Sequence, residues 1–248
     1  MPETAILVWI AFTFLLAGTV KGIIGMGLPL IAMGLLTTVT GLHPAMALML
    51  APAFVTNVWQ AFAGGQTVAV VKRIWPFLAA STLSIWLGAM ALTRVDVRAL
   101  SALLGFLLAA YGLIGLLRPP FIIAPGRQTV SGLVAGIING ILAGMTGSFS
   151  IPGVPWLQAI GLTRDQLIQA MGMLFTLSTL GLALALRNQN LLTTELGLIS
   201  AAAVLPALAG MVLGQMIRHR LSGAQFRLVF FVSMIVLGVY IILRVVMK

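Results

Sequence analysis

The sequence predicts an all-α, polytopic integral membrane protein with about eight hydrophobic segments in two repeats. Its composition is 60% hydrophobic and only 7% charged, with a mean hydropathy of +1.14, whereas soluble domains carry about 25% charged residues. A chain of 248 residues has room for roughly eight crossings at about 20 residues each. A glycine-rich motif also occurs twice. We therefore expect one integrated transmembrane domain and no soluble domain.

The repeated motif divides the chain into two copies of one unit. The first stretch, Gly18–Pro29, reads G-T-V-K-G-I-I-G-M-G-L-P, and the second, Gly140–Pro155, reads G-I-L-A-G-M-T-G-S-F-S-I-P-G-V-P. One offset of 122 positions aligns their glycines: Gly18 with Gly140, Gly22 with Gly144, and Gly25 with Gly147. The sequence therefore predicts a first membrane repeat over residues 1–120 and a second over 121–248.

The first hydrophobic stretch is too long to be a single membrane helix. Residues 5–39 number 35 and would form a helix of about 52 Å, against a hydrocarbon core of about 30 Å. Glycine loosens the backbone and proline removes a donor, so we expect a break at Gly25, Gly27 and Pro29. The result is either a hairpin or a span followed by a re-entrant half-helix.

Three further segments complete the first copy. They run from Pro44 to Gly64, from Trp75 to about Leu92, and from Val97 to Leu117. Asp96 is suited to cap the last of these. The proline-containing stretch 119–127 then forms the connection between the copies.

The second copy starts at Thr129 with glycines at every fourth position: Gly132, Gly136, Gly140 and Gly144. This spacing places all four on one helix face, which favours close contact with another helix backbone. We expect the helix to break across Gly147 to Pro155, as the first copy breaks at its own motif.

Three segments follow the second break. Thr163 and Gln166 have the spacing of a capping box and open the segment that runs to Leu186. The next segment starts at Thr194, and the last segment ends at Val246. The connecting cations do not alternate with one phase along the chain, which is the pattern expected of inverted repeats.

The two breaks predict a binding site for an anion. Unwound backbone in a bilayer is tolerated only beside a cavity or ligand, and a half-helix N-terminus offers N–H donors and positive potential. Lys21 lies inside the first motif, where an uncompensated ammonium is costly. Ser148 and Ser150 flank the second break and could donate to an oxyanion.

The candidate substrate-binding residues come from the two motifs and the segment after the first one. They are Lys21, Gly22, Gly25, Gly27, Pro29, Asn57, Gln60, Gly144, Gly147, Ser148, Ser150 and Pro152. Each feature also has a purely structural interpretation. A proline kink shapes packing, Lys21 extends to an interface, hydroxyls bond their own helix, and amides bond neighbouring helices.

Several function classes are excluded by what the sequence lacks. The four acids, Glu3, Asp96, Asp165 and Glu195, all fall at segment edges, so no carboxylate proton relay crosses a span. Two histidines and no cysteine give no metal site, and no catalytic cluster or nucleotide loop is present. We expect no enzyme activity and no cofactor. The net charge of +10 fits loops at a phospholipid surface and not nucleic acid.

The two glycine motifs with following prolines, one early in each half, resemble the sulfite exporter TauE/SafE family. That resemblance covers the whole chain. It implies a multi-pass permease of the bacterial inner (plasma) membrane for small sulfur-containing anions such as sulfite, sulfoacetate or related organosulfonates.

The expected function is therefore anion transport. We predict a secondary carrier or facilitator that binds its substrate between the two broken helices near the bilayer midplane. Rocking of one repeat against the other would alternate access. The expected partners are a small anion and the lipid bilayer, and the chain could also form a homodimer. The alternative is a non-transporting membrane subunit that anchors or stabilises a complex.

Overall fold

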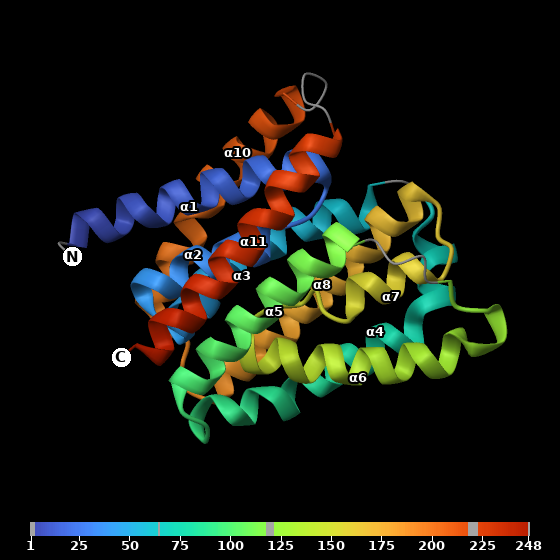
Figure 1. Ribbon diagram of the computed structural model, residues 1–248, viewed down its shortest axis with the longest axis horizontal. Coiled ribbons are helices and arrows are strands. Elements are labelled where there is room, and N and C mark those ends of the chain that lie inside the picture. The colour runs from blue at the N-terminus through green and yellow to red at the C-terminus, as the bar shows by residue number, and fades with distance from the viewer. Residues whose placement is uncertain (1–2, 64, 118–121, 218–222, 248) are drawn as a thin grey trace. The chain divides into compact units, whose positions relative to one another are not determined.

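The computed structural model describes residues 3–63, 65–117, 122–217 and 223–247, and these residues contain helices and no strand (Figure 1). Eight of the described helical stretches are long and apolar enough to cross a membrane, which confirms the predicted fold class. The α-helices are α1 (Glu3–Ile24), α2 (Leu28–Thr40), α3 (Leu42–Phe62), α4 (Thr67–Ala89), α5 (Val97–Leu117), α6 (Gln128–Thr146), α7 (Gly153–Ala159), α8 (Arg164–Asn188), α9 (Thr194–Ala202), α10 (Val204–Ile217) and α11 (Gly223–Val246), and short 3-10 turns are η1 (Met90–Thr93) and η2 (Pro125–Arg127).

The helices form two compact units, and each unit takes segments from both halves of the sequence. Unit 1 comprises Met1–Pro52, Val95–Arg118 and Leu191–Lys248, and unit 2 comprises Ala53–Arg94 and Pro119–Asn190. Helix α3 contributes to both, since it passes from unit 1 to unit 2 after Pro52. The predicted repeats at 1–120 and 121–248 are a division by sequence and stay a prediction.

The first glycine motif ends one helix and begins another. Helix α1 stops at Ile24, and α2 starts four residues later at Leu28 with Pro29 in its first turn. Gly25 and Gly27 have φ angles of 80° and 105°, a region that L-residues with side chains avoid. We call Gly25-Met26-Gly27 the first break.

The second motif also interrupts the helix, over a shorter stretch than the sequence predicts. Helix α6 stops at Thr146, where Gly147 forms a left-handed cap with a φ angle of 72°. Helix α7 begins at Gly153, so Pro155 lies inside it. We call Gly147–Pro152 the second break.

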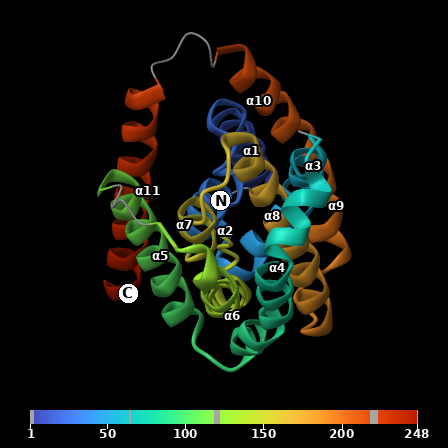
Figure 2. The ribbon, with the colours of Figure 1, turned by 90° about the vertical axis from the view of Figure 1, so that its right-hand side faces the viewer.

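In unit 1, two pairs of helices lie side by side, α1 with α10 and α5 with α11 (Figures 1 and 2). The first pair is close because glycines of α1 face the backbone of α10. A Cβ added at Gly18 would overlap the carbonyl oxygen of Ala207. A Cβ added at Gly22 would overlap that of Met211.

In unit 2, α6 packs along α4 in the same manner (Figure 1). A Cβ at Gly140 would overlap the carbonyl oxygen of Ser81, and one at Gly144 would overlap that of Ile85. Gly136 likewise approaches the α4 backbone. Gly132, the first glycine of the predicted face, instead approaches the side chain of Trp156.

The two helix pairs use equivalent positions of the sequence. Gly18 and Gly140 are 122 positions apart, and the carbonyls that they face, those of Ala207 and Ser81, are 126 apart. Gly22 and Gly144 face Met211 and Ile85 with the same two offsets. The first helix of each predicted repeat thus packs against the third helix of the other, in the same register.

The helix starts that the sequence predicts from polar residues are also observed. Thr163 and Gln166 form both hydrogen bonds of a capping box at the start of α8. The Asp96 carboxylate accepts the Arg98 amide at 2.8 Å at the start of α5. The other three acids, Glu3, Asp165 and Glu195, lie in the first turns of α1, α8 and α9. All four therefore lie at helix starts.

Candidate functional site

The candidate residues fall into two groups, one in each unit. Lys21, Gly22, Gly25, Gly27 and Pro29 belong to unit 1. The remaining seven, Asn57, Gln60, Gly144, Gly147, Ser148, Ser150 and Pro152, belong to unit 2.

Lys21 is a buried cation in the last turn of α1. Only 4% of its surface is exposed, and its carbonyl oxygen accepts the Gly25 amide at 2.7 Å, which closes the helix at the first break. A cation at a helix C-terminus interacts favourably with the negative end of the helix dipole. Helix geometry therefore stabilises Lys21 in addition to its side-chain contacts.

The start of α2 presents buried backbone donors at the first break. No side chain caps this helix, and Pro29 has no N–H. The first backbone bond of the helix joins the Ile31 amide to the Gly27 carbonyl at 3.0 Å. The preceding residue Leu28 is fully buried, so this turn is a positive helix end inside the protein.

Two aromatic side chains of unit 1, those of Phe230 and Tyr111, lie next to the first break. A Cβ at Gly27 would lie 3.0 Å from the Phe230 ring, so glycine is required both by its φ angle and by this ring. The Tyr111 hydroxyl donates to the sulfur of Met26 at 3.1 Å. The break is therefore held by helices α5 and α11.

Gly22 and Gly144, which the sequence places in the substrate site, have a packing role in the structure. Both face the backbone of the neighbouring helix at the close contacts described above. Their assignment to the anion stays a prediction, and their contribution to helix packing is what the contacts show.

The second break carries a buried hydroxyl without a protein partner. The Ser148 side chain is 1% exposed, and its Oγ has no hydrogen-bond partner among the described residues. Its backbone amide donates to Thr146 Oγ1 at 3.2 Å, and the Thr146 hydroxyl donates to the Leu142 carbonyl at 2.7 Å. Thr146 thus fixes the backbone, while the Ser148 hydroxyl is available to a ligand or water.

Asn139 connects the second break to α4. Its side-chain oxygen accepts the Gly153 amide at 2.9 Å, and its amide nitrogen donates to Ser81 Oγ at 3.0 Å. Asn139 and Ser81 are both fully buried. One side chain of α6 therefore positions the start of α7 and binds α4, a role that the candidate set did not include.

Ser150 and Pro152 of the second break differ in burial. Ser150 is 3% exposed, and its carbonyl accepts the Val154 amide at 2.9 Å. Pro152 precedes α7 and lines a cavity of about 460 Å³ together with Arg127 and Trp156. Pro152 therefore lies at the wall of a cavity within unit 2.

The Gln60 amide of α3 binds the neighbouring helix α8. Gln60, 7% exposed, donates to the Ile168 carbonyl at 2.8 Å. In return, the side-chain amide of Gln169 in α8 donates hydrogen bonds to the Ala61 carbonyl at 3.0 Å and to Thr67 Oγ1 at 2.8 Å. Gln60 thus has the interhelical role that was the structural alternative for it.

Helix α8 adds a second buried hydroxyl without a partner in the described chain, that of Ser178. The neighbouring Thr179 hydroxyl instead donates to the Phe175 carbonyl at 2.6 Å. Phe175 lies 6.5 Å, between ring centroids, from Phe149 of the second break. Ser178 was not among the candidates. The sequence places it in a polar patch with Thr176 and Thr179, and hydrogen bonding between helices accounts for such a patch as well as ligand contact does.

The chemistry available at these residues is hydrogen-bond donation and positive charge. Hydroxyls, backbone amides and one ammonium can bind an oxyanion. Among the described residues, no group of three or more His, Asp or Glu side chains could hold a metal ion.

Comparison with known proteins gives one match. The model of the family described as "Sulfite exporter TauE/SafE" matches residues 10–241. No curated protein and no solved structure matches the chain.

Proposed function

The chain belongs to the sulfite exporter TauE/SafE family, and on that premise we propose that it carries a small sulfur oxyanion or organosulfonate, such as sulfite or sulfoacetate, across a membrane. The family match over most of the chain and the eight apolar helices support transport of sulfur-containing anions. The bacterial inner membrane is the proposed location. The homodimer has no support in these observations.

We propose that the two breaks contact the anion. The observation that carries this proposal is the Ser148 hydroxyl, which is buried and has no partner among the described residues. Leaving a buried polar group unpaired costs about 1–3 kcal/mol, so such a group is retained where a ligand or water completes its bonding. Lys21 supplies the charge that favours an anion over a neutral solute.

The carboxylates support a carrier without its own proton relay. All four lie at helix starts, so none is placed to carry protons through a span. Transport then follows the gradient of the anion, or a proton moves on the substrate itself. The orientation of the repeats and the rocking motion belong to this proposal.

Lys21→Met tests the role of the ammonium. The loss of a charged hydrogen-bond donor is expected to weaken anion binding by about tenfold or more. The variant should still fold, since the loss of the side-chain contacts of Lys21 is offset by removal of a buried ammonium, whose burial costs about 2.5–3.5 kcal/mol. Lys72→Met, which removes an exposed lysine of α4, is the matched control. The two variants are compared by anion flux in liposomes and by thermal unfolding.

A thermal-shift screen identifies the anion. A ligand at about 100 times its dissociation constant adds about 2.7 kcal/mol of stability. Sulfite, sulfoacetate, thiosulfate, sulfate and small carboxylates are compared on the wild type and on Lys21→Met. Stabilisation of the wild type by sulfur anions alone supports the proposal, and equal stabilisation of Lys21→Met removes Lys21 from the site.

A further inference from the structure

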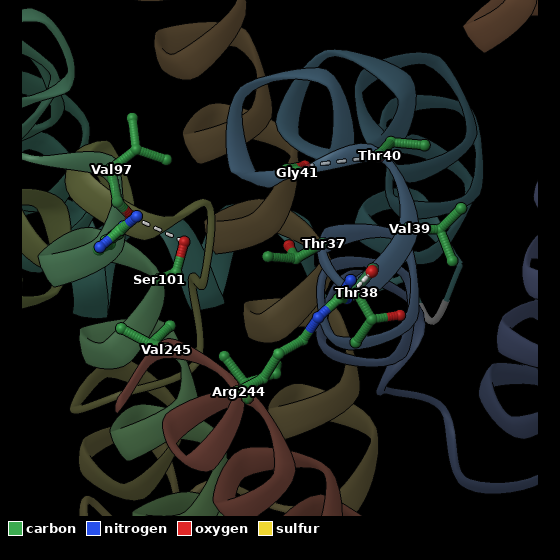
Figure 3. Close-up of a pocket in the computed structure, with 11 residues that line it drawn as sticks. Thr37, Thr38, Val39, Thr40, Gly41, Val97, Ser101, Arg244 and Val245 are labelled. Atoms are coloured by element: carbon green, nitrogen blue, oxygen red, sulfur yellow. Dashed lines mark hydrogen bonds between the residues drawn. The ribbon is translucent and has the colours of Figure 1, made fainter. Parts of the chain in front are cut away.

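A cavity lies in unit 1, and no residue of the first break lines it. It has a volume of about 310 Å³ and is lined by the end of α2, the start of α5 and the end of α11 (Figure 3). Two arginines line it, Arg98 and Arg244, and no acidic residue does. A cavity with two guanidinium groups and no carboxylate in its wall favours an anionic occupant.

Arg244 is held in place by the backbone of α2. Its side chain extends toward Thr38 and donates a hydrogen bond to the Thr38 carbonyl oxygen (Figure 3). This bond compensates the negative end of α2 within the cavity. A guanidinium has five N–H donors, so donors remain for another ligand. No carboxylate forms an ion pair with Arg244 in the described part of the chain.

The start of α5 contributes further positive potential. Arg98 is exposed, and its backbone amide is capped by the Asp96 carboxylate at 2.8 Å. Asp96 is the nearest acid in sequence and does not line the cavity. The Asp96 carboxylate already compensates the amide end of α5, so the positive charge that this segment brings to the cavity is that of the Arg98 side chain.

One hydroxyl oxygen of the cavity is buried and has no hydrogen-bond partner in the described part of the chain. The Thr37 Oγ1 atom forms no hydrogen bond with any described residue. By contrast, the hydroxyls of Thr38 and Thr40 donate to the carbonyls of Leu35 and Leu36. Thr37 therefore offers a neutral hydroxyl donor in the wall of the cavity that the two arginines also line.

The cavity lies where helices that span a membrane come to their ends. Helix α5 has 21 residues, a length of about 32 Å that matches the hydrocarbon core. Its first residue, Val97, and the last turn of α11 at Val245 both line the cavity. Ends of such helices lie at the level of the lipid headgroups, where basic pockets between helices bind phosphate groups.

We propose that this cavity binds a phosphate group at the membrane surface, held by Arg98, Arg244 and the Thr37 hydroxyl. The phosphate is that of an anionic phospholipid or a free phosphate ion. Apolar side chains of the same wall, those of Val39 and Ile241 among them, are compatible with the acyl chain of a lipid. This inference does not depend on the proposed transport function.

The test compares phosphate sources on purified full-length protein in a neutral detergent. Phosphatidylglycerol, phosphatidylcholine and inorganic phosphate are titrated separately, and binding is followed by native mass spectrometry and thermal shift. Binding of phosphatidylglycerol alone identifies a lipid headgroup, and binding of inorganic phosphate identifies the free ion. Either result supports phosphate binding in the cavity if that binding is lost in the arginine variants.

The variants remove one charge or both. Arg98→Gln is expected to weaken binding about fivefold, and Arg98→Gln with Arg244→Gln about thirtyfold. Arg98→Gln breaks no hydrogen bond seen for that side chain, so it remains informative if loss of the Arg244 bond to Thr38 impairs folding. The matched control is Arg227→Gln, which removes an exposed arginine near the other end of α11.

Three results would overturn the proposal. The first is binding of phosphatidylglycerol and phosphate that does not change in Arg98→Gln or in the double variant. The second is an equal loss in Arg227→Gln, which would indicate a general effect of net charge. The third is preferential binding of sulfite that depends on the two arginines, which would make the cavity a site for the transported anion.

Discussion

Among single residues, Ser148 allows an effect on ligand binding to be distinguished from an effect on folding. Its hydroxyl is buried and has no partner among the described residues, so Ser148→Ala removes no protein hydrogen bond of that side chain. We expect the melting temperature to stay constant or rise, while anion binding weakens by about tenfold, the loss of roughly one hydrogen bond to a charged group.

The control for Ser148→Ala is Thr179→Val. The Thr179 hydroxyl is equally buried but donates to a carbonyl of its own helix, so this variant should leave binding unchanged. Melting curves and anion titrations of both variants decide the matter. A Ser148→Ala protein that melts earlier and binds anion normally would assign the hydroxyl to structure.

Asn139 differs from Ser148, since its side chain has two hydrogen-bond partners and no predicted contact with the anion. Asn139→Leu would leave the Gly153 amide and the Ser81 hydroxyl without their partners, at about 1–3 kcal/mol for each buried group. We expect a clear fall in melting temperature, measured by thermal unfolding in detergent beside Thr179→Val. Equal stability of the two variants would mean that water replaces the amide.

The sequence identified some of these residues and missed others for physical reasons. Lys21 and Ser148 were candidates because a charge or hydroxyl beside a glycine break is visible in the sequence, and their contact with the anion stays a prediction. The role of Asn139 could not, since its partners Ser81 and Gly153 lie 58 and 14 positions away. The contacts of Gly22 were also beyond prediction, because a glycine motif does not reveal whether backbone or ligand approaches it.

At the scale of elements, the glycine contacts between α6 and α4 give a prediction about helix packing. Gly140→Ala would place a methyl group against the Ser81 carbonyl, and forced overpacking costs about 1–3 kcal/mol. The variant should melt at a lower temperature. The same holds for Gly18→Ala at the equivalent contact of α1 with Ala207.

Gly197→Ala is the matched control for these variants. A Cβ at Gly197 of α9 would meet nothing within 4 Å, and alanine favours a helix over glycine by up to about 1 kcal/mol. This variant should melt at the same temperature or higher. A similar response of all three glycine variants would show that the close contacts do not limit stability.

The helix boundaries were largely predictable, because glycine and proline act locally. The first break was expected at Gly25, Gly27 and Pro29, and the structure has it between Ile24 and Leu28. The second was expected as far as Pro155, yet α7 already begins at Gly153. Proline is tolerated in the first turn of a helix, so its presence did not extend the break.

At the scale of the whole chain, the number of spans followed from composition, and the pairing of helices did not. Hydropathy predicts which segments enter a membrane, but a helix that is apolar on all sides does not indicate its neighbour. The structure pairs α1 with α10 and α4 with α6, each across the two halves of the sequence. The equivalent register of these pairs agrees with a duplicated ancestor, and the orientation of the repeats stays a prediction.

We propose that this chain moves a sulfur-containing anion by itself. The most direct measurement reconstitutes the purified protein in sealed liposomes loaded with sulfite and follows sulfite release, with protein-free liposomes as the control. We expect saturable release that the Ser148→Ala variant slows and that sulfoacetate on the outside alters by competition. Release at the rate of protein-free liposomes for sulfite and for sulfoacetate would contradict transport and favour a subunit that anchors a membrane complex.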